Sequence, residues 1–244
     1  MEILTSAFSD KGGRLHNEDN FEYNLKNNRG VWIVADGLGG MAGGELASGF
    51  VAEYIKNNTF ALKSFNKESL LDLMNNVNRA LIEEQKKLKM KKGMRTTVAA
   101  AFMEADSITS IHFGDSRFYY FRNHEILYQS RDHSMSQVAV DLGEIELKDI
   151  RFHEDRSCVL KVLGNDEILK SKTQPFTEKI KPGDAFLLCT DGFWELTYEE
   201  EMIECLQRAN TPQLWLENML NILSGRMTDN SDNFTAICCI AKTN

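Results

Sequence analysis

Two apolar stretches of this chain run directly into the dipeptide Asp-Gly, and this feature constrains the fold more than any other. The first stretch, VWIVADGLGG, reaches Asp36-Gly37, and the second, FLLCTDGFWE, reaches Asp191-Gly192. A short apolar run that ends in a turn residue is typical of a buried strand, and an acid at its end is held on rigid backbone at the rim of a sheet. Several such acids at one rim would form an oxygen-rich site for hard divalent cations.

Three further segments place an acid beside a predicted strand. RLHNED begins with Arg14 and carries Glu18 and Asp19, GDSR carries Asp115, and SDNFTAICCI carries Asp232. A single acid of this kind is most often a solvated turn residue, because Asp and Asn side chains bond their own backbone in turns. Five such segments, each next to an apolar strand, are better explained by a shared site.

The side chains of these segments are hard oxygen donors. The sequence has no His and Cys cluster at the spacing of a zinc site, so Mg²⁺ or Mn²⁺ suits the oxygens best. Two such ions about 3.5–4 Å apart can lower the pKa of a shared water, and the resulting hydroxide can attack phosphorus. Arg14 is the candidate for holding the phosphate, because a guanidinium binds phosphate through two parallel hydrogen bonds.

The order of the predicted elements favours an α+β fold. Strict alternation of strand and helix is absent, which argues against a doubly wound parallel sheet and for antiparallel sheets with helices on their outer faces. The length of 244 residues and the lack of a linker predict one domain, residues 1–244. Strands are expected at 2–10, 19–25, 30–36, 95–104, 107–115, 117–122, 125–130, 185–190 and 234–241, and helices at 43–57, 67–89, 134–142, 198–209 and 212–224.

Charge and cysteine usage limit the partners and the compartment. The net charge of −8 argues against a nucleic-acid groove. Five scattered cysteines without CxxC spacing indicate reduced thiols in a cytosol. The N-terminus lacks the basic and apolar regions of a signal peptide, and no apolar run is long enough to cross a bilayer. We therefore expect a cytoplasmic monomer with no membrane or nucleic-acid partner.

The acids belong to a longer series of short motifs that together resemble one family. The chain resembles the metal-dependent serine/threonine protein phosphatases, the protein phosphatase 2C or PPM family, from about residue 3 to residue 241, and its DGLGG form is similar to the bacterial branch. Each motif alone is weak, whereas eight in order are specific. The motifs are Arg14-x-x-x-Glu18-Asp19, Asp36-Gly37-x-Gly39-Gly40, Thr96-Thr97, Gly114-Asp115-Ser116-Arg117, Asp132-His133-Ser134, Leu163-Gly164, Asp191-Gly192 and Asp232-Asn233-x-Thr235.

The resemblance implies a four-layer αββα sandwich, in which two antiparallel sheets are flanked by helices, and it implies two core ions. Asp36 would bridge both ions, and the Gly37 carbonyl would bind one of them. Glu18 would join the second ion, while Asp191 and Asp232 would hold the first. The ions would be Mn²⁺ or Mg²⁺, and the implied activity is hydrolysis of phosphoserine and phosphothreonine by a hydroxide that bridges them.

Further roles follow from the same resemblance. Asp115 would support a possible third, weaker ion together with Asp191. Arg14 would bind the substrate phosphate, and Asp19 would assist catalysis from behind the ligands. Residues 135–165 would contain a flap that selects substrates. The partners implied are phosphorylated proteins and a cognate serine/threonine kinase.

Two positions depart from the family pattern. Position 38 is Leu, where the eukaryotic branch has a His proposed as general acid; bacterial members commonly have an apolar residue there. Arg95 stands where the family usually has Gly, either as a tolerated surface variation or as an additional phosphate contact.

Two other functions stay open at this point. A binding module with a decayed site would have lost at least one of the metal acids, and none is missing here. A phosphatase of small phosphoesters would share the same acids, because specificity depends on the flap and the rim of the site. The sequence separates this second alternative poorly from a protein phosphatase.

Overall fold

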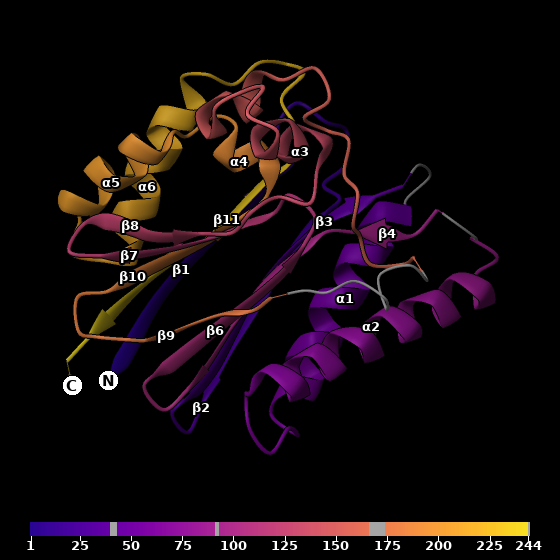
Figure 1. The fold of residues 1–244 in the computed structure, drawn as a ribbon, viewed down its shortest axis with the longest axis horizontal. Helices are drawn as coiled ribbons and strands as arrows, with labels where there is room; N and C mark the ends of the chain where they lie inside the picture. Colours follow the sequence, from indigo (N-terminus) through magenta and orange to yellow (C-terminus); the bar gives the residue numbers. More distant parts are fainter. Residues whose placement is uncertain (40–42, 91–92, 166–173, 244) are drawn as a thin grey trace.

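Two antiparallel sheets pack face to face between two layers of helices (Figure 1). The computed structural model describes residues 1–39, 43–90, 93–165 and 174–243, so Gly40 of the DGLGG motif lies outside the described residues. The first sheet has the order β1-β11-β10-β7-β8, and the second has the order β2-β3-β5-β6-β9 with β4 paired to β3. This arrangement confirms the predicted αββα sandwich. The extension of one domain over all of residues 1–244 stays a prediction.

Most of the predicted elements are present with shifts of one or two residues at their ends. The strands are β1 (Glu2–Asp10), β2 (Asp19–Lys26), β3 (Arg29–Leu38), β4 (Arg95–Thr96), β5 (Val98–Glu104), β6 (Ser107–Phe113), β7 (Arg117–Arg122), β8 (Glu125–Gln129), β9 (Phe176–Lys179), β10 (Ala185–Cys189) and β11 (Phe234–Lys242). The helices are α1 (Gly43–Thr59), α2 (Lys67–Lys87), α3 (Met135–Asp141), the 3₁₀ helix η1 (Leu147–Phe152), α4 (Asp191–Trp194), α5 (Glu199–Gln207) and α6 (Pro212–Ser224).

The central strands are apolar on both faces because both faces are covered. In β3, Val31 and Ile33 belong to the core under α1 and α2, whereas Trp32 lies between the two sheets. In β10, Leu187 packs under α5 and α6, whereas Phe186 points between the sheets. The rings of Trp32 and Phe186 meet edge to face at 4.9 Å. Since side chains alternate along a strand, each strand serves two cores at once.

The helices are fixed by caps and by one buried face each. The Asn66 side chain accepts a hydrogen bond from Ser69 N at 2.9 Å and begins α2. Thr211 caps α6 in the same way, and Pro212 occupies its first turn, where no backbone donor is needed. Figure 1 shows α5 and α6 on the outer side of the first sheet and α1 and α2 on the outer side of the second. None of the described helices is long and apolar enough to cross a membrane.

Two of the shifted strand ends lie next to Asp-Gly. β3 does not end at Asp36 but continues to Leu38, because Gly37 and Leu38 pair with Thr96 and Arg95 of β4. The second strand, β10, ends at Cys189, and Asp191 begins the short helix α4. The sequence alone places each Asp-Gly at or just after the end of its strand, where the glycine allows a sharp turn or the close approach of a ligand. The backbone partner on β4 and the helix after Thr190 are tertiary features that the dipeptide does not reveal.

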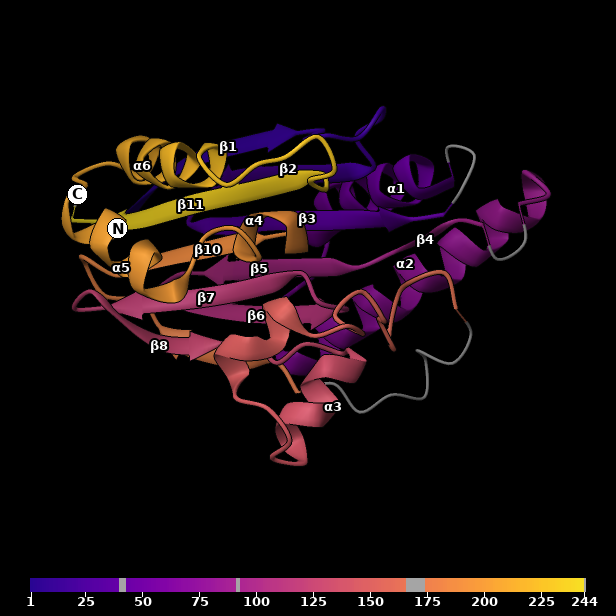
Figure 2. The ribbon, with the colours of Figure 1, turned by 90° about the horizontal axis from the view of Figure 1, so that it is seen from above.

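The region between β8 and β10 contains two elements that the sequence did not predict. The 3₁₀ helix η1 follows α3, and β9 pairs with the edge of β6. Both are short and weakly patterned, which explains why no periodicity marks them. Residues 135–165, the predicted flap, lie beside α4 (Figure 2). Their role in substrate selection stays a prediction.

Candidate metal centre

One cavity of about 1010 Å³ collects the predicted site residues from distant parts of the sequence. Arg14 and all six predicted ligand residues line it, whereas Asp19 is not among its lining residues. Leu15, His16, Leu38, Glu45, Ser157 and Val159 also contribute and were not predicted as site residues. The lining is Gly13, Arg14, Leu15, His16, Glu18, Asp36, Gly37, Leu38, Gly39, Glu45, Asp115, Ser157, Val159, Asp191, Asp232 and Asn233.

Asp36 is positioned by the strand that carries it and by two threonines. Its backbone N–H donates to Thr97 Oγ1 at 3.1 Å, and its carbonyl accepts from Thr96 Oγ1 at 2.8 Å and from Thr97 N at 2.9 Å. Thr97 is in turn bonded to Ser116 Oγ at 2.7 Å, next to Asp115. The Thr96-Thr97 motif therefore fixes the backbone of Asp36 and ties it to the turn that carries Asp115.

Gly37 allows the first turn of α1 to approach the strand closely. A Cβ at this position would lie 2.2 Å from the carbonyl oxygen of Gly44 and 2.6 Å from that of Glu18. Only a residue without a side chain fits between these two backbones. The Gly37 N–H donates to the Glu18 carbonyl at 3.1 Å, so the glycine also joins the Glu18 segment to β3.

Asp19 is buried directly behind the cavity, opposite Asp36 in the β2–β3 pairing. One of its carboxylate oxygens accepts hydrogen bonds from Thr190 Oγ1 at 2.8 Å and from Thr235 Oγ1 at 2.7 Å. Burial raises its pKa to about 7, although the two hydroxyl donors oppose the shift. Asp19 thus joins both sheets beneath the site, which is compatible with a supporting role.

The segment that carries Glu18 is held by a single amide side chain. Asn233 Oδ1 accepts from Glu18 N at 2.8 Å, and Asn233 Nδ2 donates to the carbonyls of Lys11 at 2.8 Å and His16 at 2.9 Å. The loop between β1 and β2 is therefore fixed to the start of β11. The sequence drew attention to Asn233 only as a neighbour of Asp232, because hydrogen bonds across more than 200 positions leave no local signal.

Asp115 approaches the cavity from the β6–β7 turn, and Asp191 approaches it from the start of α4. Asp115 follows β6 and is 2% exposed, and its Oδ1 has no hydrogen-bond partner among the described residues. Asp191 begins α4, and its Oδ1 accepts from Gly192 N at 2.7 Å. A buried carboxylate oxygen without a donor is costly unless a cation or a proton satisfies it.

The carboxylates raise one another's pKa values. Burial raises the pKa of Asp36 well above its usual range, and the neighbouring charge of Asp191 adds to the shift. Burial likewise raises the pKa of Asp191, with Asp115 as the next cause. The pKa of Asp115 rises to about 7, mainly through burial and secondly through Asp132. Like charges in one enclosed space favour protonation or a bound cation.

Arg14 and Asp232 form an ion pair at the open side of the cavity. Arg14 Nη2 lies 2.8 Å from Asp232 Oδ2, and the two side chains are 56% and 46% exposed. The pair is surrounded by water and therefore contributes little to stability. Because both residues line the cavity, the guanidinium already lies at the mouth of the acid cluster.

The donor set suits a hard cation, although the acids do not close around one position. Among the described residues, no three His, Cys, Asp or Glu side chains are arranged so that they could hold one ion by themselves. Mg²⁺ and similar ions commonly keep several waters and take only one or two carboxylates from the protein. The unpartnered oxygen of Asp115 and the mutual repulsion of Asp36 and Asp191 fit such loosely ligated ions.

The two departures from the family pattern lie next to each other. Leu38 lines the cavity and pairs in register with Arg95 of β4. Arg95 itself is not among the lining residues, so the idea of an additional phosphate contact gains no support.

Comparison with known proteins places this geometry in a family. The family model for protein phosphatase 2C matches residues 11–225. The chain belongs to the protein phosphatase 2C family. Both the resemblance seen in the motifs and the predicted fold class are therefore confirmed, whereas the roles of individual residues are not tested by these matches.

Several bacterial members of the phosphatase 2C family are similar to this chain. The serine/threonine phosphatase Stp of Listeria monocytogenes is 31% identical over 216 residues, which cover 85% of each chain. The serine/threonine protein phosphatase PstP of Mycobacterium tuberculosis is 29% identical over 209 residues, which cover 85% of this chain and 39% of PstP.

Solved structures agree with the observed architecture. Stp1 of Staphylococcus aureus is 25% identical with a TM-score of 0.87, and the match covers 100% of this chain and 96% of that one. The catalytic domain of PstP, solved in complex with two manganese ions, is 25% identical with a TM-score of 0.82, and the match covers 99% of both chains.

Proposed function

We propose that this chain is a metal-dependent protein phosphatase that hydrolyses phosphoserine and phosphothreonine. The observation that carries the proposal is the convergence of five acids and Arg14 on one cavity. Its nearby relatives are named serine/threonine phosphatases, and a similar catalytic domain contains two manganese ions. Membership of the protein phosphatase 2C family supports the same chemistry.

The residues present fit two Mn²⁺ or Mg²⁺ ions. We assign Asp36 to both ions, the Gly37 carbonyl to one of them, Glu18 to the second ion, and Asp191 and Asp232 to the first. When bound, such ions would lower the pKa of a water between them and offset the charge of the phosphate.

A third, weaker ion would use Asp115 together with Asp191. The Oδ1 of Asp115 supports this assignment, because it is buried and has no hydrogen-bond partner among the described residues.

Arg14 would bind the substrate phosphate. A guanidinium can hold two phosphate oxygens at once, which orients phosphorus relative to the acids below. In the structure the side chain is bonded to Asp232, so substrate and Asp232 would compete for the same donors. Asp19 would support the site from beneath the cavity, because its carboxylate fixes β2 to Thr190 and Thr235. It does not line the cavity itself.

The substrates we propose are phosphorylated proteins, and the partner is the serine/threonine kinase that modifies them. We also propose a monomer that acts in the cytoplasm. The net charge of −8 is compatible with substrates met by diffusion and unfavourable for nucleic acid. A wide cavity mouth with Arg14 and Leu15 exposed at its rim suits a side chain that projects from a peptide.

Phosphate release from a phosphothreonine peptide tests the proposal. Release should require Mn²⁺ or Mg²⁺, stop in EDTA, and fall by about three orders of magnitude or more in Asp36→Asn, since that acid would help to hold both ions. Asp106→Asn, an exposed acid paired with Lys179 on the far edge of the second sheet, is the matched control and should retain full activity. Unchanged release by Asp36→Asn would refute the mechanism.

Two measurements distinguish the remaining alternatives. Comparable or faster turnover of small phosphoesters than of phosphopeptides would favour a metabolite phosphatase. Stable phosphopeptide binding without phosphate release would favour a binding module. Neither alternative is supported by a specific contact in the cavity.

A further inference from the structure

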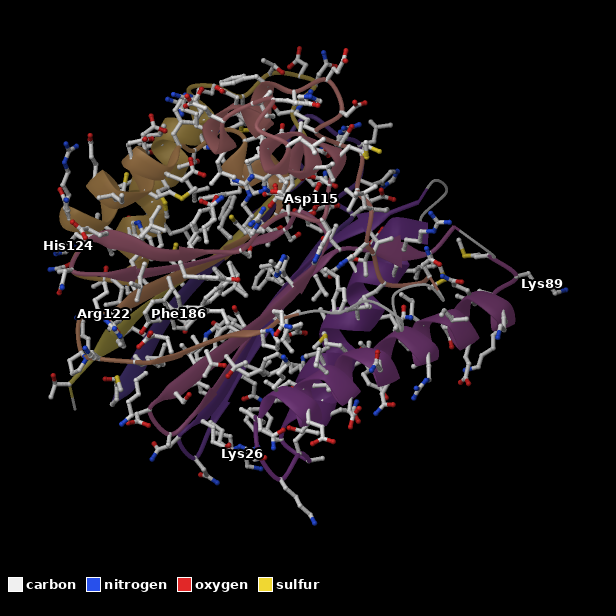
Figure 3. All side chains as sticks on the ribbon, in the orientation of Figure 1. Lys26, Lys89, Asp115, Arg122, His124 and Phe186 are labelled. Atoms are coloured by element: carbon white, nitrogen blue, oxygen red, sulfur yellow. The ribbon has the colours of Figure 1, made fainter. Side chains whose placement is uncertain are left out.

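Trp194 links the two segments that carry Asp115 and Asp191. It is the last residue of α4, which Asp191 begins, and it is 1% exposed. Its indole Nε1 donates a hydrogen bond to the backbone carbonyl of Asp115 at 2.9 Å. Asp115 is labelled in Figure 3 in the turn between β6 of the second sheet and β7 of the first, just below the helices α3 and α4 of Figure 1. The Trp194 side chain therefore connects the helix that begins with Asp191 to the turn that contains Asp115.

The orientation of Trp194 is itself fixed from two further directions. The Arg117 guanidinium lies over the indole ring, 3.5 Å from its centroid. Arg151 Nη1 donates to the Trp194 carbonyl at 2.8 Å, which binds the end of α4 to η1 in the flap region. Rotation of the indole would break its stacking with Arg117 and its hydrogen bond to Asp115, while Arg151 holds the backbone of Trp194 in place.

The arginines belong to a buried ionic cluster, which we define as Arg117, Asp132, Arg151 and Glu199. Arg117 binds Asp132 with two hydrogen bonds of 2.9 and 2.7 Å, and both side chains are almost fully buried. Arg151 and Arg117 both pair with Glu199 of α5. Buried charges are strongly destabilising when one partner is removed, so this cluster is a rigid support. None of its members lines the cavity.

A support of this kind is needed because Asp115 and Asp191 repel each other. The charge of Asp115 raises the pKa of Asp191, and Asp115 Oδ1 has no hydrogen-bond partner among the described residues. Without a fixed spacing the two acids would move apart until a cation drew them together. Groups that orient metal-binding side chains commonly change metal affinity by about 10–100-fold when removed.

We propose that Trp194 is a positioning residue that sets the separation of Asp115 and Asp191, and thereby the affinity for the ion that this pair would hold. The inference rests on the proposed function, because it assumes that the acids bind divalent cations. It assigns to Trp194 a role beyond its packing in the core. The indole ring packs in the core, and its N–H bonds the backbone of Asp115.

The substitution Trp194→Phe isolates the N–H. It keeps an aromatic ring under Arg117 and removes the donor to the Asp115 carbonyl. Trp215→Phe is a matched control, because Trp215 is equally buried in the same core and its Nε1 also donates to a backbone carbonyl, that of Met202 at 3.0 Å. Both variants lose one indole hydrogen bond and should show a similar decrease in thermal midpoint.

Mn²⁺ binding measured by titration calorimetry separates the two variants. In Trp194→Phe, the weakest class of Mn²⁺ site should lose about 10–100-fold in affinity, and the Mn²⁺ concentration for half-maximal phosphate release should rise correspondingly. At saturating Mn²⁺, kcat should recover towards the wild-type value. Trp215→Phe should bind Mn²⁺ as the wild type does.

The outcomes distinguish this inference from the proposed function. Equal Mn²⁺ isotherms for wild type and Trp194→Phe, in a wild type that releases phosphate, would overturn the inference alone. A similar loss of affinity in Trp215→Phe would also overturn it, because the effect would then reflect general destabilisation. A wild type that neither binds Mn²⁺ nor releases phosphate would refute the proposed function and this inference with it.

Discussion

Asp36 and Arg14 line the same cavity but are held there by different means. Asp36 lies within a strand whose neighbours on both sides are paired, and its backbone groups are bonded to two threonines. Arg14 lies in the exposed loop after β1, and the one described partner of its guanidinium is the equally accessible Asp232. We call Asp36, Asp115 and Asp191 the inner side of the site, and Arg14, Glu18 and Asp232 its outer side.

This difference indicates that the inner and outer sides of the site have different functions. The inner side is built from strand β3, from the start of α4 and from the β6–β7 turn, which the Thr97–Ser116 hydrogen bond ties to the Thr96-Thr97 motif. Its geometry therefore exists before any ligand arrives. The outer side depends on loops that meet at Asn233, and its charged side chains reach solvent. We therefore expect changes on the inner side to abolish chemistry, and changes on the outer side to weaken capture of ions and substrate.

The largest expected effect compares one acid from each side. Asp191→Asn should lower kcat for a phosphothreonine peptide by about 10³-fold or more at any Mn²⁺ concentration, because the lost charge belongs to a group of acids that raise one another's pKa values. Asp232→Asn should lose about 10–100-fold and should be partly rescued by excess Mn²⁺, since that carboxylate is open to water and ion exchange. Equal and unrescued losses in both variants would contradict this difference between the two sides. The measurement is a kcat and KM series over Mn²⁺ concentration.

A second comparison concerns backbone rigidity. A Cβ added at Gly37 would lie 2.2 Å from the Gly44 carbonyl oxygen, and one added at Gly13 would lie 2.3 Å from that of Asp229. Gly37→Ala should cost about 3 kcal/mol, because the strand and α1 cannot separate, whereas Gly13→Ala should cost about 1 kcal/mol, because the exposed loop can yield. Thermal midpoints should fall by about 2–4 °C per kcal/mol. A larger decrease for Gly13→Ala would show that the outer loop is the stiffer of the two.

The third prediction concerns pH and the protein without metal. The pKa values of Asp19 and Asp115 are raised to about 7, so the folded state holds protons that the unfolded state releases near pH 4, and stability falls as pH rises through about 7. His112 and His133 have lowered pKa values and act in the opposite direction, but only below about pH 6.5. The thermal midpoint in EDTA should therefore decrease between pH 6.5 and 8.

Metal addition and one variant sharpen the pH prediction. Mn²⁺ should remove the decrease, because a cation that binds the folded state compensates the deprotonated acids. Asp115→Asn, which carries no charge at that position, should show a smaller decrease in EDTA than the wild type. A midpoint that rises from pH 6.5 to 8 in EDTA would contradict the raised pKa values.

The smallest expected effect is that of the exposed ion pair on stability. Arg14→Ala should change the free energy of unfolding in EDTA by less than about 1 kcal/mol, since both partners are solvated. The same variant should raise KM for the phosphopeptide strongly. A large loss of stability on denaturant unfolding would place Arg14 in the scaffold instead of the substrate contact.

Much of the fold could be predicted from local patterns. The apolar strand around Trp32 and the amphipathic helices after Gly43 and Lys67 were predicted within two or three residues. Apolar residues recur there with the period of the strand or helix, and this spacing can be seen in the sequence. The acids of the site were found for a related reason. Each acid stands at the end of an apolar strand, and this position can be recognised without knowing which other strands or helices pack beside it.

Other features had no local signal. The continuation of β3 through Gly37 depends on the two residues of β4, and the helix that Asp191 begins interrupts what looked like a turn. The bond from Trp194 to the Asp115 carbonyl crosses 79 positions of the chain. Such contacts are set by how the layers pack, which no window of the sequence contains.

The sequence by itself determined which side chains this protein offers, since residue type and strand periodicity are properties of a short segment. The tertiary structure alone decided their relations: that Asp36, Asp115 and Asp191 face one cavity, and that Asn233 and Trp194 hold the segments around them. The physical reason is that charge repulsion keeps such acids apart unless distant backbone is fixed around them. That constraint arises only when both sheets and their helices are packed.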